Sequence, residues 1–77
     1  MSKPAQSKVI TLTVDNAGQQ ADAQLSDEET LALAQLLKRL TWSDMRGCAV
    51  DDAETYIIRD AVGKVQDALG RAGYAPR

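Results

Sequence analysis

The sequence of 77 residues contains no histidine and no phenylalanine, and its only cysteine is Cys48. A single cysteine cannot form a disulfide within the chain, and without histidine no cluster resembles a structural zinc site. No base stands near Cys48 in the sequence, so no nucleophile and base are paired for catalysis. We therefore expect neither an enzyme nor a bound cofactor, and we expect Cys48 to be packed, because free cysteines are commonly buried.

Excess charge and long apolar runs are also missing. Nine basic and eleven acidic residues give a net charge of -2, so no positive field attracts nucleic acid. No stretch approaches the ~18 apolar residues that a membrane span needs. The lysines near the start precede no apolar signal-peptide segment. We expect a cytoplasmic protein that does not enter membranes or bind nucleic acid directly.

The chain is short enough for its stability to be a concern. A domain of about 60 residues buries only ~60% of its unfolded surface. The missing stability must come from tight helix packing or from the surface of a partner. We predict one small domain over residues 8–74, with a flexible tail at 1–7 and a second tail at 75–77.

The N-terminal part favours β structure. Residues 9–14 (VITLTV) are mostly β-branched and apolar, which predicts a short strand. Residues 15–18 (DNAG) form a turn signal. The polar residues 19–24 fit either a second strand, which would complete a weak hairpin, or a loop.

Two long helices are predicted after this region. Ser26 and Glu29 match a capping box at the start of the first, which should run to about Leu40. Asp51 and Glu54 match a second box, whose helix should fade between residues 70 and 73. Both helices have an apolar face. The residues expected in the core are Leu33, Leu36, Leu37 and Leu40, followed by Ile57, Ile58, Ala61, Val62, Val65, Ala68, Leu69 and Ala72.

The residues between the two helices complete the predicted fold. Residues 41–47 are typical of a short helical turn that Gly47 stops. The predicted class is α+β: a short N-terminal strand, or weak hairpin, followed by two long helices joined by a short helical turn. An unpaired strand is an edge that needs a cover, and a second copy of the chain can supply it. We therefore predict a homodimer.

Several residues are candidates for binding a partner. Tyr56 lies on the side of the second helix away from its apolar face, and Gly63 and Gly70 follow it at seven-residue intervals on the same side. A glycine inside a helix costs about 1 kcal/mol against alanine, so these glycines mark either a site of close approach or a tolerated defect. Trp42 fits both a plug in a small core and an anchor at an interface. The predicted partner-binding residues are Trp42, Arg46, Tyr56, Arg59 and Gly63.

Four segments carry a resemblance to known proteins: AQLLKR at 34–39, MR at 45–46, AVDD at 49–52 and AGYAPR at 72–77. With them, the chain from Leu25 onward resembles an uncharacterised family of small proteins carried on proteobacterial phages and integrative elements. That family implies no activity and no catalytic residues. Small phage proteins often block a host defence complex by occupying one of its surfaces, as anti-CRISPR proteins do. The resemblance thus implies an anti-CRISPR-like inhibitor that binds a host defence complex.

A different hypothesis is a dimeric ribbon-helix-helix-like DNA-binding regulator, whose paired strands read the major groove. Val9, Thr11 and Thr13 would then face DNA. Two features oppose it: about ten residues separate the strand from the first helix, and the acidic start of the second helix would repel phosphate. A third hypothesis is an antitoxin or assembly accessory that docks a helix face into a partner's groove.

Overall fold

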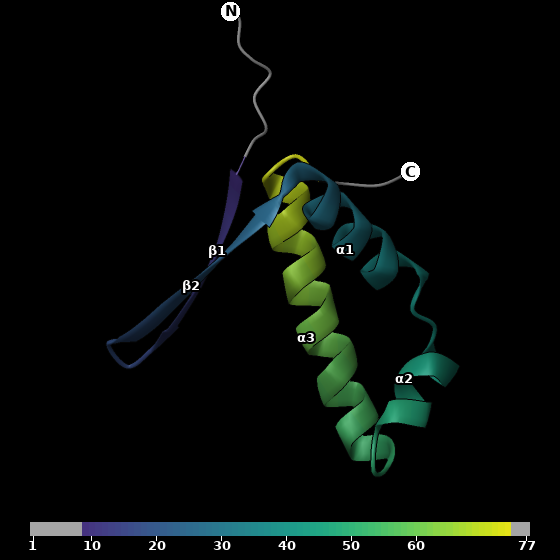
Figure 1. The fold of residues 1–77 in the computed structure, drawn as a ribbon. Helices are drawn as coiled ribbons and strands as arrows, with labels where there is room; N and C mark the ends of the chain where they lie inside the picture. The colour runs from purple at the N-terminus through teal and green to yellow at the C-terminus, as the bar shows by residue number, and fades with distance from the viewer. Residues whose placement is uncertain (1–8, 75–77) are drawn as a thin grey trace, which may run out of the picture. The chain divides into compact units, whose positions relative to one another are not determined.

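The structure is a computed structural model that describes residues 9–74. The tails predicted at 1–7 and 75–77 lie outside the described residues. The described residues divide into two compact units, with the boundary between Ala32 and Leu33. The described part is α+β, an antiparallel hairpin followed by three helices (Figure 1). The elements are β1 (Val9–Asn16), β2 (Gln19–Ser26), α1 (Asp27–Arg39), α2 (Trp42–Cys48) and α3 (Asp52–Arg71).

The predicted α+β class is confirmed, but the prediction of two long helices joined by a short helical turn is wrong in the number of helices, because the residues of that turn form a third helix, α2. The hydroxyl of Thr41 accepts from the backbone N–H of Asp44 at 3.2 Å, and the Asp44 carboxylate accepts from the Thr41 N–H at 3.0 Å. These two bonds are a complete capping box. Gly47 lies inside α2 instead of ending it, and the helix closes at Ala49, whose N–H donates to the Arg46 carbonyl at 3.2 Å.

The hairpin depends on a two-residue turn. Ala17 and Gly18 have φ angles of 52° and 93°, both in the left-handed region that a type I′ turn requires. The Gly18 N–H also donates to the Asp15 carboxylate at 3.1 Å. Residues 19–24, for which strand and loop were both open, are therefore part of β2.

The cross-strand register gives the hairpin one apolar and one polar face, because side chains alternate along each strand. Leu12 and Val14 belong to the apolar face, yet they remain 47% and 60% exposed. A two-stranded hairpin is marginally stable by itself in water. The apolar pairs are Ile10 with Leu25, Leu12 with Ala23, and Val14 with Ala21.

Helices α1 and α3 begin in closely similar ways. The Ser26 hydroxyl accepts from the Glu29 N–H at 3.0 Å, and the Glu29 carboxylate accepts from the Ser26 N–H at 2.8 Å, which confirms the predicted box. At α3 the Asp51 carboxylate accepts from the Glu54 N–H at 2.8 Å. The Glu54 carboxylate accepts from the Val50 N–H at 2.9 Å instead of from the cap residue itself.

The two most buried side chains are polar. Thr30 and Thr55 are 1% and 0% exposed, and each follows the glutamate of a helix start. The Thr30 hydroxyl donates to the Ser26 carbonyl, and the Thr55 hydroxyl donates to the Asp51 carbonyl, both at 2.9 Å. Burial is tolerated because each hydroxyl is satisfied by its own helix.

The apolar faces predicted for the core are only partly sheltered. Among the described residues, the buried hydrophobic side chains are Ala34 and Met45, at 3% and 7% exposure. Leu36 and Ile57, which were expected in the core, are 54% and 67% exposed. Cys48 is exposed as well, so its predicted burial is wrong. The helices therefore present apolar side chains at the surface.

Candidate functional site

Three of the residues predicted to bind a partner meet on α2 and α3. The ring centroids of Trp42 and Tyr56 lie 4.7 Å apart, with their planes tilted by 59°. The guanidinium carbon of Arg59 lies over the Tyr56 ring, 5.2 Å from its centroid. Both distances fit attractive aromatic and cation–π contacts. We call Trp42, Tyr56 and Arg59 the aromatic–arginine cluster.

The local sequence explains how the cluster is positioned. Trp42 is the first residue of α2, directly after its Thr41 cap. Tyr56 and Arg59 are three residues apart on α3, so they share a face. Arg46 links the two helices, because its Nε contacts the Asp52 carboxylate at 2.6 Å and its Nη1 donates to the Ala49 carbonyl at 3.2 Å. Arg46 thus already has partners inside the chain.

The cluster faces solvent. Trp42 is 39% and Tyr56 is 52% exposed, whereas Met45, also on α2, is 7% exposed. Of the two roles open to Trp42, the structure places it at the surface against Tyr56, and Met45 takes the buried position in α2. The cluster is therefore an exposed aromatic surface with a positive charge at its side.

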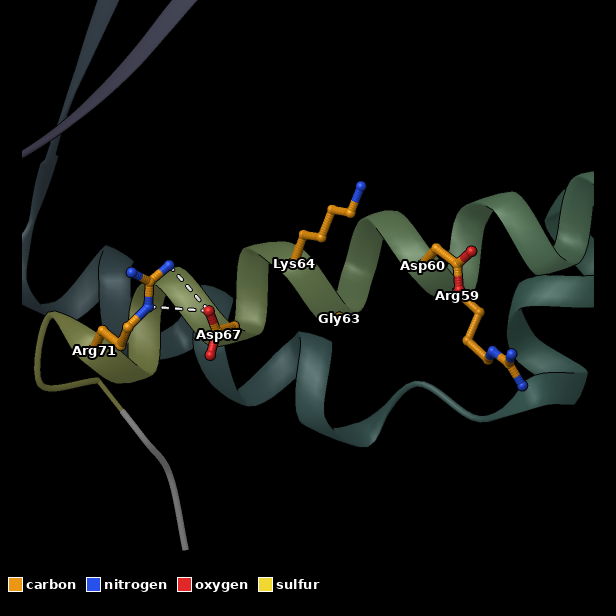
Figure 2. A pocket seen from close by; sticks show the side chains of 6 residues that line it. All are labelled: Arg59, Asp60, Gly63, Lys64, Asp67 and Arg71. Carbon is orange, nitrogen blue, oxygen red and sulfur yellow. Dashed lines mark hydrogen bonds and ion pairs between the residues drawn. The ribbon is translucent and has the colours of Figure 1, made fainter.

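Gly63 lies apart from this stacking, in a shallow groove on α3. The groove holds about 500 Å³ and is lined by Arg59, Asp60, Gly63, Lys64, Asp67 and Arg71. Among the described residues, nothing lies within 4 Å of the position a Gly63 side chain would take, so none of them requires this glycine. Arg59 lines the groove and also joins the cluster, and it extends from α3 away from Lys64 (Figure 2).

The groove charges are paired only in part. Arg71 Nη2 and the Asp67 carboxylate form an ion pair at 3.0 Å, as their spacing of four residues favours. Asp60 and Lys64 have the same spacing, yet in the described part of the chain neither forms an ion pair. The groove was not predicted from the sequence, although the sequence shows its alternating charges at spacings of four, three and four residues.

The remaining site chemistry is limited. The Thr41 backbone N–H, and then its hydroxyl, hydrogen-bond to Asp44 and hold the pKa of that exposed carboxyl below its ordinary value of 3.8. Within residues 9–74, no group of three or more His, Cys, Asp or Glu side chains is placed to hold a metal ion. No helix in the same range is long and apolar enough to cross a membrane.

Residues 3–77 match a family described as a family of unknown function, DUF7706, and the chain belongs to that family. No curated protein and no solved structure matches the chain. The description of the family gives neither an activity nor a ligand.

Proposed function

We propose that this member of a family without an assigned activity is a non-enzymatic protein-interaction module, and that the aromatic–arginine cluster is its binding surface. The observation that carries the proposal is Tyr56, which contacts both Trp42 and Arg59 while remaining 52% exposed. Tryptophan, tyrosine and arginine are the residue types most enriched in binding hot spots. Because these side chains are already ordered by one another, binding costs them little further conformational freedom.

The charge of Arg59 bears on the chemistry of the partner. Arg59 forms no ion pair with any described residue, so its guanidinium edge is available to a carboxylate of the partner. The partner surface that fits is therefore an apolar or aromatic depression with an acidic side chain at its rim.

We further propose that the partner is a host defence complex of the CRISPR type, which the protein inhibits. The support is the resemblance of residues 34–39 and 72–77 to small proteins of phages and integrative elements. Inhibition by occupying a surface needs no catalytic group, and a compact aromatic surface with one cation is sufficient for a hot spot.

The DNA-binding alternative has less support. In the ribbon-helix-helix plan, two copies contribute one strand each to the ribbon, whereas β1 pairs with β2 of its own chain. Thr11 and Thr13, which were expected to face DNA, share the polar face of the hairpin with Asp15 and Asp22. Carboxylates on that face would repel phosphate.

The test uses the single tryptophan of the chain. Replacing Trp42 with 5-fluorotryptophan gives one fluorine resonance that reports on the cluster. We expect this resonance to shift or broaden when a purified CRISPR surveillance complex is added. Tyr56→Ala and Arg59→Ala should each weaken binding by about tenfold or more, as hot-spot residues do. Arg39→Ala, an exposed cation of α1, is the matched control and should bind like the wild type.

Each variant is first shown to be folded by circular dichroism. Unchanged affinity of a folded Tyr56→Ala protein would contradict the assignment of the cluster. If no surveillance complex perturbs the resonance, but duplex DNA binds with a steep dependence on salt, the regulator hypothesis takes its place.

A further inference from the structure

Helix α3 carries an exposed apolar stripe that is distinct from the aromatic–arginine cluster. The stripe consists of Ile57, Ala61, Val65 and Ala68, and the C-cap residue Ala72 continues it. These residues recur every three or four positions, so they follow one face of the helix. All are exposed, Ile57 by 67% and Val65 by 41%. Within residues 33–74, no described element covers this face.

A row of charges runs beside the stripe. Asp60, Lys64, Asp67 and Arg71 each directly precede a stripe residue, so the row lies about 100° round the helix from it. The signs along the row alternate between negative and positive. Figure 2 shows the pair between Asp67 and Arg71 and the separate positions of Asp60 and Lys64. One acid and one base of the row are thus without an ion-pair partner among the described residues.

We propose that the stripe binds α3 of a second copy, antiparallel, across a twofold axis at the midpoint between Val65 and Gln66. This axis places the charge row of one α3 beside the charge row of the other α3, running in the opposite direction, because a twofold contact joins the same patch on both subunits. Asp60 then faces the partner's Arg71, and Lys64 faces the partner's Asp67. Every facing pair has opposite charges. In a parallel pair the row would instead lie against the opposite flank of the partner's stripe, which carries Ile58, Val62 and Leu69, so its charges would face no opposite charge.

The same axis also interleaves the two stripes. With a rise of about 1.5 Å per residue, the partner's Ala72 falls between Ile57 and Ala61, and the partner's Ala68 falls between Ala61 and Val65. Side chains from the two copies then alternate at steps of about 3 Å along the contact, except at the axis, where the two Val65 side chains are offset by about 1.5 Å. The facing charge pairs and the interleaved apolar side chains therefore each favour the same antiparallel register.

This contact does not cover the aromatic–arginine cluster. Tyr56 and Arg59 lie about 140–160° round α3 from the centre of the stripe. The dimer presents two copies of the cluster, and the dimer proposal stands or falls separately from the proposed function.

The first test is sedimentation equilibrium of the full chain up to about 200 µM, where even a weak dimer is populated. Lys64→Glu and Asp67→Lys each create two like-charge contacts, and each should raise the dimer dissociation constant by about tenfold or more. An equal mixture of the two variants restores opposite charges at both contacts and should form a heterodimer. A wild-type chain that stays monomeric, or single variants that dimerise like the wild type, would overturn the proposal.

The second test measures orientation by disulfide formation in a Cys48→Ser background. Val65→Cys lies next to the axis and should cross-link to itself on oxidation. Ile57→Cys belongs to the same stripe, but its two copies would lie about 25 Å apart in the antiparallel pair, so it should not cross-link. Both positions are exposed, so neither change removes a buried contact. Equal cross-linking of the two variants would indicate a parallel pair and overturn the proposal.

Discussion

The hairpin and the α2–α3 region are ordered by different means. No side chain of β1 or β2 is buried, so the hairpin relies on its backbone ladder and on the turn at Ala17 and Gly18. In α2 and α3, by contrast, Met45 and Thr55 are buried, and Trp42 stacks on Tyr56. Side-chain truncation should therefore be costly in α2–α3 and cheap in the hairpin, whereas backbone strain should matter most in the turn.

The largest difference is expected from truncating one apolar side chain in each region. Met45→Ala removes a side chain that is 7% exposed and should lower the free energy of unfolding by about 2–4 kcal/mol. Leu12→Ala, at 47% exposure, should cost about 1 kcal/mol or less. Urea unfolding followed by circular dichroism measures both, and equal losses would contradict the contrast between the regions.

Removing a helix cap should have an intermediate effect. Asp51→Ala and Ser26→Ala should each lower stability by about 1 kcal/mol, because each leaves one backbone N–H of the first turn without its acceptor. Glu28→Ala, in the same turn as the Ser26 cap but with no capping bond, is the control and should cost less. Hydrogen exchange at the Glu54 and Glu29 amides locates the effect. Unchanged protection of these amides would show that the caps do not hold the helix starts.

Two glycine substitutions should act with opposite signs. Gly18→Ala forces a side chain into a φ of +93°, which should cost about 1–2 kcal/mol. Gly63→Ala adds a methyl group in open space inside a helix, and it should stabilise the protein by about 1 kcal/mol. Thermal unfolding midpoints that move in the same direction would contradict this prediction.

The smallest effect is expected from acidification of α2. The folded state holds the pKa of Asp44 below 3.8, so it binds fewer protons there than the unfolded state does. The stabilisation of α2 by the Asp44 carboxylate is fully present above the ordinary pKa of 3.8. It is lost as the pH falls through the lower pKa that Asp44 has in the folded state. Between about pH 5 and pH 2, the urea midpoint of the wild type should therefore fall further than that of Asp44→Asn. Parallel curves for the two proteins would show that this carboxylate does not stabilise α2.

The sequence predicts the helix starts well and the buried residues poorly. Ser26 and Asp51 cap their helices as predicted because capping depends on residues that are close in the chain. The same rule could have predicted α2, since Thr41 and Asp44 have the spacing of a capping box. The prediction of the buried residues failed because apolar periodicity identifies one face of a helix but does not show which element covers that face. The buried threonines follow from hydroxyl bonds within their own helices.

The candidate site was predictable as residues but not as a cluster. The sequence predicts Trp42, Tyr56 and Arg59 as partner-binding residues because these residue types are common in binding hot spots. No spacing rule joins Trp42 to Tyr56, because they stand on different helices and meet only when α2 packs on α3. The second strand was similarly undecided, since polar residues 19–24 pair with β1 only after the turn sets the register.

The helix caps also bear on how quickly the chain folds. The bonds that start α1, α2 and α3 join residues three or four positions apart. Such short loops lose little entropy on closing, and proteins dominated by local contacts fold within about microseconds to milliseconds. The first turn of each helix can therefore form, dissolve and form again before distant parts of the chain meet. Refolding after dilution from urea should be correspondingly fast, with the caps already formed in its transition state.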